Sequence, residues 1–222
     1  VGPLREVGAL VLDASRAITV GEGALYIAGG VESMTRAPFV VGKSETAYGR
    51  EFRVFDSSIG ARFPNPRLSQ AHGDDTMPQT ADNVAAQLGL SRADSDRFAA
   101  ASQSRYARAL ADGFFAGEIT PVEVPTGRKT PPRIVSADEH PRPQSGFDVL
   151  QGLKPLQEGG VVTAGNASGI NDGAAALFIG NRTVGEQAGA APLARILSGA
   201  VSGVEPRVMG LGPAYAIPKA LE

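Results

Sequence analysis

Cysteine is absent from the 222 residues, and histidine occurs only twice, as His72 and His140. Without a thiol, these residues form no disulfide, no thiolate metal site and no cysteine nucleophile. The two histidines are too few and too scattered along the chain to predict a metal cluster. Thiol chemistry and thiolate metal sites are therefore excluded for the residues present.

Long apolar runs and an excess of one charge are also missing. The chain has 21 Lys and Arg against 23 Asp and Glu, a formal net charge of -2, which predicts no nucleic-acid partner. No stretch reaches the roughly 18 apolar residues of a transmembrane helix. Asp13 and Arg16 interrupt the apolar start, so we expect no signal peptide and no membrane partner, and therefore a cytoplasmic location. The first residue is Val1 rather than Met, which predicts a processed chain or a fragment.

Hydrophobic residues make up 42% of the chain, enough for the core of one or two domains. Apolar residues at helical spacing predict a helix over 8–20, which Gly21 and Gly23 end. The short apolar run 24–28 has the pattern of a buried parallel strand, and Gly29-Gly30 follows it directly. A helix, a strand and a glycine-rich crossing in this order predict an α/β fold.

The rest of the chain alternates between irregular and regular segments. Residues 35–77 lack periodicity but carry several aromatic side chains, which predicts an ordered insertion such as a lid or binding element. A capping box at Ser91 predicts the start of a long helix that runs to about Leu110. Other expected elements are helices over 80–88, 182–188 and from 213, strands over 119–124, 161–164, 173–179 and 194–201, and a loop-rich stretch over 125–160.

Two segments combine glycine with small or polar residues in ways that suit a ligand. In the first, AGGVESM (28–34), the glycine pair allows close approach of another chain or marks a plain strand-to-loop turn. The second, TAGNASGINDG (163–173), offers N–H groups and caps to a polar ligand. Its alternative is turn chemistry that satisfies its own polar groups, and the residues alone leave both interpretations open.

Several segments occur in an order that resembles the thiolase family. The resemblance extends from about Leu12 to the end of the chain, with Asp82 where the family has Glu. The matching segments are AGGVESMTRAPFV (28–40), MPQTADNVA (77–85), FFAGEITPV (114–122), DEHPRP (138–143), VTAGNASGINDGAAAL (162–177), ARI (194–196) and VEPRVMGLGP (204–213).

The resemblance implies an α/β fold with layered α-β-α halves and an inserted loop domain, incomplete at both ends. Residues 1–38 and 161–192 would belong to the N-terminal core. Residues 39–160 would form the inserted loop domain, which holds coenzyme A in thiolases. Residues 193–222 would begin the C-terminal half.

The resemblance also implies an activity, that of an acetyl-CoA C-acyltransferase. Such an enzyme cleaves a β-ketoacyl-CoA with coenzyme A, which is a substrate rather than a cofactor, and it assembles as a homo-oligomer, a dimer or tetramer. Segment 41–66 resembles the thiolases that cleave β-ketoadipyl-CoA in aromatic-acid degradation. The alternatives are a fatty-acid β-oxidation thiolase and a non-catalytic remnant that binds coenzyme A or oligomerises.

Four candidate binding residues follow from the resemblance. Ala167 and Ser168 would contact the pantetheine arm of coenzyme A, because a small side chain allows approach and a hydroxyl bonds amides. Arg142 would lie near the nucleotide end, where a fixed cation suits phosphate, and its alternative is a solvated loop arginine. Met77 would line the acyl pocket, and its alternative is a core methionine.

The resemblance places the catalytic groups of the family elsewhere. Thiolysis needs an activated thiolate, a histidine and a second thiol, together with sites that stabilise an oxyanion. The family's nucleophilic cysteine aligns with Leu4. Its Asn-Glu-Ala-Phe, His-Gly-Gly and Cys-x-Gly segments come after the stretch that matches 204–222. We therefore predict no catalytic residue in this chain and no activity of the 222 residues alone.

Overall fold

The computed structural model describes the backbone of residues 2–222 and the side chains of residues 8–222. The chain forms two compact units: unit 1 contains the residues up to Met77 together with Ile170–Glu222, and unit 2 contains Pro78–Gly169. Helices and strands are mixed along the chain, so the predicted α/β class is confirmed. None of the helices in residues 2–222 is long and apolar enough to cross a bilayer.

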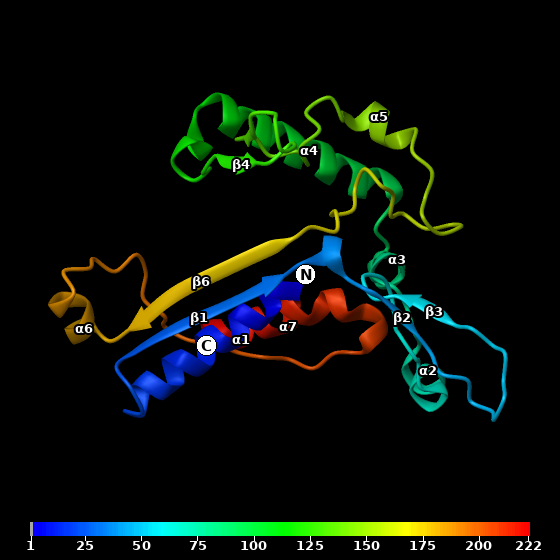
Figure 1. Cartoon of the computed structure of the whole chain (residues 1–222), viewed down its shortest axis with the longest axis horizontal. Coiled ribbons are helices and arrows are strands. Elements are labelled where there is room, and N and C mark those ends of the chain that lie inside the picture. The colour runs from blue at the N-terminus through cyan, green and yellow to red at the C-terminus, as the bar shows by residue number, and fades with distance from the viewer. Residues whose placement is uncertain (1) are drawn as a thin grey trace. The chain divides into compact units, whose positions relative to one another are not determined.

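Unit 1 is built on one long helix and two long strands. Helix α1 (Gly2–Thr19) packs along β1 (Leu25–Glu32) and β6 (Gly173–Gly180), as Figure 1 shows. The helix ends where Gly21 adopts a φ of 82° and the N–H of Glu22 bonds the carbonyl of Ala17 (3.0 Å). Glycine tolerates this left-handed conformation, which explains why the predicted stop at Gly21 is correct.

Strands β1 and β6 pair antiparallel, with Leu25 opposite Gly180 and Glu32 opposite Gly173. The predicted parallel strand was therefore wrong in direction. An apolar run indicates burial, but the route of the chain decides the direction of the neighbouring strand. The glycine pair lies inside β1 and not in a turn. A Cβ on Gly29 would lie 2.9 Å from the carbonyl oxygen of Ala175, so Gly29 permits close approach to β6 of the same chain.

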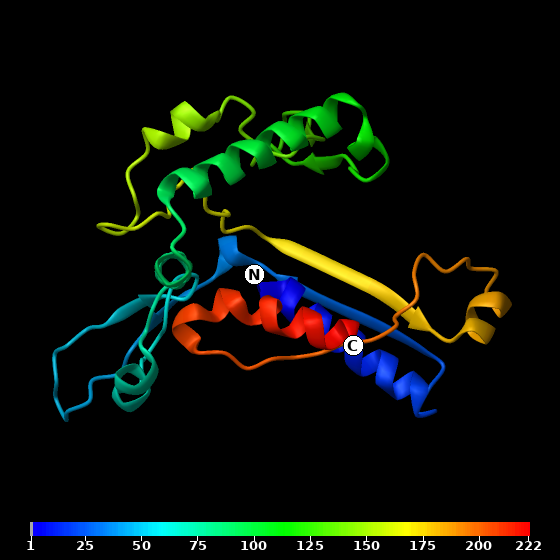
Figure 2. The same cartoon turned by 180° about the vertical axis from the view of Figure 1, so that it is seen from behind.

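The two-stranded sheet has one covered face and one exposed face. Ala14 of α1 and Ala28 of β1 are buried. On the opposite face, Ile27 is paired with Phe178, and these side chains are 67% and 78% exposed. Figure 2 shows the two strands side by side from behind, as does Figure 1 from the front. Strand β1 is therefore buried on one face only, unlike the fully buried strand that its composition predicts.

The remaining elements of unit 1 are short. The stretch expected to be irregular contains a small antiparallel hairpin, β2 (Phe39–Val41) with β3 (Val54–Asp56). The strand predicted over 194–201 is absent from the described structure, because no neighbouring strand supplies a ladder of hydrogen bonds for it. The other elements are η1 (Met34–Arg36), α2 (Pro66–His72), α6 (Arg182–Gln187), η3 (Pro206–Leu211) and α7 (Gly212–Leu221).

Unit 2 is organised around α4 (Arg92–Ala111), with α3 (Met77–Leu88) before it and α5 (Phe147–Gln151) packed against it. A left-handed Gly89 (φ 66°) ends α3, as predicted. The hairpin of β4 (Val122–Val124) and β5 (Arg133–Val135) and the short helix η2 (Phe114–Gly117) complete the unit. Residues 161–164 form only one isolated bridge, between Thr163 and Pro155, and not the expected strand.

The start of α4 generates a prediction. The Ser91 side chain accepts the N–H of Asp94 (3.1 Å), and the Asp94 carboxylate accepts the N–H of Ser91 (3.1 Å), which forms the predicted capping box. We expect Ser91→Ala to lower the free energy of unfolding by about 1 kcal/mol, because the N–H of Asp94 loses its acceptor and the Asp94 carboxylate loses the bond from the Ser91 hydroxyl (2.6 Å). Urea unfolding followed by circular dichroism measures this.

Ser104→Ala, at an exposed position inside the same helix, is the matched control. Alanine has the higher helix propensity, so this change is expected to be neutral or slightly stabilising. An equal loss of stability in both variants would contradict the capping role of Ser91.

Candidate functional site

The turn that carries Ala167 and Ser168 begins in a segment held by Asp82 of α3. The Asp82 Oδ1 accepts the N–H groups of Val161 (2.7 Å) and Val162 (3.0 Å). Its Oδ2 is buried and has no hydrogen-bond partner among the described residues. A Cβ on Gly160 would overlap this carboxylate, so the glycine leaves room for it. Asp82, which stands where the family pattern has Glu, thus ties α3 to the start of the turn.

The second anchor of the turn is Asp96, a carboxylate on α4 with no exposed surface. Its Oδ2 accepts hydrogen bonds from Arg92 Nε (2.6 Å) and Gln151 Nε2 (2.6 Å). Its Oδ1 accepts one from Asn166 Nδ2 (2.9 Å). The carboxylate therefore joins α4, α5 and the turn in a single cluster of side chains.

Arg92 extends this cluster to the end of α5. Its Nη2 donates to the carbonyl oxygens of Leu150 (2.6 Å) and Leu153 (2.8 Å). Leu150 is fully buried, and its side chain limits the space beside the turn. A Cβ on Gly165 would lie 2.5 Å from methyl carbons of both leucines, so only glycine fits at this position without rearrangement.

The pKa of Asp96 reflects two opposed effects. Burial raises the pKa of Asp96. The hydrogen bonds from Arg92, Asn166 and Gln151, together with the positive charge of Arg92, outweigh burial and hold the pKa below its ordinary value. The group is therefore ionised in the folded protein near neutral pH. An ionised carboxylate accepts from all three donors at once, as the geometry requires.

Asn166 stabilises the turn through both the oxygen and the nitrogen of its side-chain amide. Its Oδ1 accepts the N–H of Thr163 (2.7 Å), and its Nδ2 donates to the carbonyl of Val161 (2.9 Å) as well as to Asp96. The N–H of Ala167 donates to the carbonyl of Thr163 (3.0 Å). The polar groups of Thr163 and Asn166 thus satisfy one another, which supports the turn-chemistry interpretation for this part of the segment.

Ala167 and Ser168 follow directly after these bonds. Ala167 is partly buried and Ser168 is exposed. The turn therefore presents a small side chain and a hydroxyl next to a backbone that α3 and α4 both hold. The structure brings these two predicted residues together, and their contact with a ligand stays a prediction.

Arg142, the third candidate, lies on the surface of unit 2. Its backbone N–H donates to Gln103 Oε1 of α4 (2.8 Å). Its Nη1 donates to the carbonyl oxygens of Glu139 (2.5 Å), His140 (3.0 Å) and Pro141 (3.0 Å). These bonds fold the guanidinium back on its own loop and leave the Nη2 and Nε donors for an anion such as phosphate.

Met77, the fourth candidate, belongs to unit 1 and is 50% exposed, so it is not a core methionine. It lines a cleft of about 360 Å³ together with His72, Asp75 and Arg207, among others. Arg207 Nε and Asp75 Oδ2 form an ion pair at 2.6 Å, and the Asp75 side chain is only 16% exposed. The hydrogen bond and charge of Asp75 raise the pKa of Arg207 above its ordinary value.

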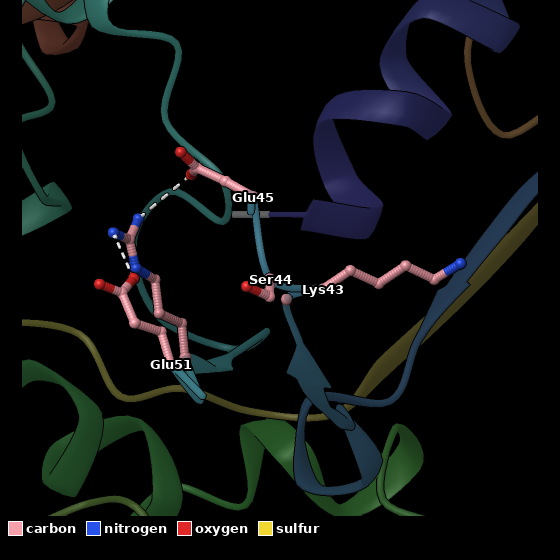
Figure 3. Close-up of a pocket in the computed structure, with 6 residues that line it drawn as sticks. Lys43, Ser44, Glu45 and Glu51 are labelled. Atoms are coloured by element: carbon pink, nitrogen blue, oxygen red, sulfur yellow. Dashed lines mark hydrogen bonds and ion pairs between the residues drawn. The ribbon is translucent and has the colours of Figure 1, made fainter. Parts of the chain in front are cut away.

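A second depression in unit 1 is nearly filled by its own side chains. Arg53 forms ion pairs with Glu45 (3.5 Å) and Glu51 (3.3 Å) between β2 and β3, as the dashed lines in Figure 3 show. Lys43 points away from these carboxylates in the same view. Because the space amounts to about 10 Å³, roughly that of one water molecule, it holds no organic ligand.

Asp172 belongs to the part of the glycine-rich segment 163–173 that lies in unit 1, and its hydrogen bonds stabilise the sheet. Asp172, just before β6, accepts the N–H (2.9 Å) and the hydroxyl (2.7 Å) of Thr35, which follows β1. The backbone and side-chain hydrogen bonds of Thr35 lower the pKa of Asp172. This pair joins the ends of both strands and is a structural cap rather than a ligand group.

The local sequence gives no sign of the role of Asp96, the residue that organises the turn. Its spacing of four residues from Arg92 is typical of an exposed helix ion pair. Only the return of 151 and 166 to α4 shows that the carboxylate is buried. Within the described part of the chain, no three His, Asp or Glu side chains come close enough to hold a metal ion.

The folded units and this turn can now be compared with known proteins. The family model described as "Thiolase, N-terminal domain" matches residues 8–183. The chain therefore belongs to the thiolase family, as the ordered segments predicted. The aligned cysteine position, Leu4, lies in the backbone of α1, and its side chain lies outside the described residues.

Among curated proteins, the chain is 52% identical over 209 residues to the β-ketoadipyl-CoA thiolase of Pseudomonas aeruginosa. It is 51% identical over 210 residues to the 3-oxoadipyl-CoA/3-oxo-5,6-dehydrosuberyl-CoA thiolase of Escherichia coli K12. Each alignment covers 94% of this chain and 52% of the relative. The chain thus spans about half the length of the curated relatives that it matches.

Solved structures confirm the fold over this half. The human mitochondrial 3-ketoacyl-CoA thiolase superposes with a TM-score of 0.84 at 36% identity, over 99% of this chain and 54% of that one. The same human enzyme in complex with CoA gives a TM-score of 0.83 at 35% identity, over 53% of that chain. The predicted α/β thiolase fold is therefore confirmed for the residues present.

The buried Asp96 generates a prediction about stability. We expect Asp96→Asn to lower the free energy of unfolding near neutral pH by about 3 kcal/mol, because an amide replaces the charge that neutralises Arg92. Since folding lowers the pKa of Asp96, its contribution is present above the unfolded pKa of about 3.9 and is lost as pH falls through the folded pKa. The difference between wild type and variant should therefore shrink below about pH 4.

Urea titrations at a series of pH values from neutral to acid measure this difference. Asp112→Asn, at an exposed position at the end of the same helix, is the control and is expected to change stability little. The linkage would be refuted if the difference in the free energy of unfolding between wild type and Asp96→Asn stayed constant down to the lowest pH at which the protein folds.

Proposed function

We propose that this chain is the coenzyme-A-handling part of an acetyl-CoA C-acyltransferase that acts on β-ketoadipyl-CoA. The reaction cleaves a β-ketoacyl-CoA with free coenzyme A and yields acetyl-CoA and a shortened acyl-CoA. The observation that carries the proposal is the identity of about half of all positions with β-ketoadipyl-CoA thiolases over 94% of the chain. The solved human relative with CoA bound supports coenzyme A as the ligand.

In this proposal, the turn of unit 2 receives the pantetheine arm. Ala167 allows the arm to approach the backbone, and the Ser168 hydroxyl bonds one of its amides. The rest of the turn needs no ligand to satisfy it, because Asn166 and Thr163 bond one another. The site is therefore formed before coenzyme A arrives, which reduces the entropy lost on binding.

Arg142 supplies the charge for the nucleotide end of coenzyme A. Its Nη1 is occupied by loop carbonyls, so the guanidinium is held in place while its other donors face a phosphate. Met77 lines the space for the acyl group, and its flexible thioether adapts to chain shape. Coenzyme A acts as a substrate, and no further cofactor is part of the proposal.

The 222 residues contain no Cys, so the thiolate that carries the acyl group must come from outside them. The complete enzyme is proposed to be a cytoplasmic homo-oligomer, a dimer or tetramer, as the family resemblance implies. The predicted division into residues 1–38, 39–160, 161–192 and 193–222 also stays a proposal beside the two units that the structure forms.

The absence of a nucleophile leads to a prediction about turnover. We expect the purified 222-residue chain to bind coenzyme A but to show no thiolysis of β-ketoadipyl-CoA or acetoacetyl-CoA, because it lacks the nucleophile. Isothermal titration calorimetry measures the binding, and loss of the enolate absorbance of acetoacetyl-CoA measures turnover. No heat and no thermal shift with coenzyme A would overturn the binding proposal, and measurable turnover would overturn the account of the missing chemistry.

The second prediction separates the two ends of coenzyme A. Ser168→Ala should weaken both coenzyme A and pantetheine by about two- to tenfold, the effect of one hydrogen bond. Arg142→Ala should weaken coenzyme A by a similar or larger factor and leave pantetheine unchanged, because pantetheine has no phosphate. Arg105→Ala, an exposed cation on α4, is the control. Equal losses for both ligands in Arg142→Ala would contradict its assignment to the nucleotide.

A further inference from the structure

We infer that Asp96 is a positioning residue for coenzyme A, which acts through Asn166 to set the backbone of Ala167 and Ser168. The inference rests on the proposed contact of Ala167 and Ser168 with the pantetheine arm. It assigns a functional consequence to a carboxylate that would otherwise count only toward stability. Asp96 itself does not contact the ligand in this scheme.

The first step is the uniqueness of the Asn166 orientation. Its Oδ1 must face a donor, the N–H of Thr163, and its Nδ2 must face acceptors, the carbonyl of Val161 and the Asp96 carboxylate. A flipped amide would bring oxygen against oxygen at both acceptors. Asp96 is the side chain that selects this orientation, because its ionised carboxylate accepts only.

The second step is the immobility of Asp96 itself. Arg92 and Gln151 each hold its Oδ2 at 2.6 Å, and Arg92 also donates to the carbonyls of Leu150, in α5, and Leu153, just after it. The carboxylate is completely buried, so no water competes for these donors. A group held from two sides in a low-dielectric environment transmits its position to the next hydrogen bond, that of Asn166.

The third step links Asn166 to the proposed contact residues. The N–H groups of Asn166 and Ala167 both donate to the carbonyl of Thr163, at 3.3 Å and 3.0 Å. Release of the Asn166 side chain would therefore loosen the same turn whose last residues are Ala167 and Ser168. Asp82 binds the segment before this turn through the N–H groups of Val161 and Val162. Asp96 binds the turn itself through Asn166.

The test is a double-mutant cycle on the 222-residue chain, with coenzyme A as the probe. Asp96→Asn places amide protons against the donors, and Asn166→Asp places two carboxylates face to face. Each single variant is expected to raise the Kd for coenzyme A about tenfold, the effect of one misplaced charged hydrogen bond. The exchange variant, Asp96→Asn with Asn166→Asp, restores one donor and one acceptor between the two positions, but its carboxylate at 166 still faces the Val161 carbonyl, so it should recover part of the affinity.

Rescue by the exchange variant tests the pairing of positions 96 and 166, and a control that only destabilises the helix tests whether lower stability alone weakens binding. Ser91→Ala is the matched control, since it destabilises the same helix through its cap and should leave the Kd unchanged. Amide hydrogen exchange at Ala167 provides a second readout that needs no ligand, with faster exchange expected in both single variants and slower exchange again in the exchange variant.

The outcomes separate the two proposals. Absence of coenzyme A binding by the unaltered chain would overturn the proposed function. An unchanged Kd in both single variants of a chain that binds coenzyme A would overturn the positioning role alone, as would equal losses in the single and exchange variants. If a single variant fails to fold, affinity and exchange protection closer to wild type in the exchange variant than in the remaining single variant support the inference, and equal losses in these two variants overturn it.

Discussion

A buried carboxylate is stable only where donors meet its oxygens, and in unit 2 this requirement joins segments that are far apart in sequence. Asp96 collects Arg92 from its own helix, Gln151 from α5 and Asn166 from the turn. The described apolar core of this unit is small, with Ala85, Leu150 and Val162 as its buried members. The hydrogen bonds of three side chains to Asp96 therefore contribute much of the specificity for one arrangement of these segments.

The same logic explains why the turn over 163–168 is both rigid and accessible. The N–H groups of Thr163, Gly165, Asn166 and Ala167 and the amide of Asn166 have partners within the protein, while the last two side chains of the turn remain at or near the surface. A ligand that binds there need not reorganise the chain. Gly160 and Gly165 are parts of this arrangement. A side chain at 160 would overlap Asp82, and one at 165 would overlap Leu150 and Leu153.

Unit 1 shows a different constraint. A long helix covers one face of a two-stranded sheet, and apolar residues such as Ile27 and Phe178 remain exposed on the other face. Two strands and one helix bury little surface per residue, so hydrogen bonds at the strand ends, such as those of Asp172 with Thr35, contribute to the strand register. The chain spans about half of its curated relatives, and unit 1 is the part whose sheet is small for an α/β domain.

Local signals were sufficient for the longer helices and for the family, but not for the short helices α2 and α5, which lie in stretches expected to be irregular or loop-rich. The capping box at Ser91 and the left-handed Gly21 and Gly89 depend on neighbouring residues, so their positions were predictable. The helix predicted over 8–20 ends near its expected stop but begins at Gly2, before its predicted start. The ordered segments predicted the thiolase family because they are spread along nearly the whole chain. The direction of β1, the absence of a strand over 194–201 and the burial of Asp96 were not predictable in this way.

The sequence by itself determined the absence of a thiol and the family, and it is the source of the proposed contacts with coenzyme A. Only the tertiary structure decided that Arg92 and Asp96 form a buried pair rather than a surface one, and that Asn166 faces them. The physical reason is that hydrophobic period and capping act over a few residues, whereas burial depends on which distant segments return to cover a side chain. The chain therefore belongs to the thiolase family and lacks cysteine, and its largest buried polar cluster among the described residues holds the turn over 163–168 in place.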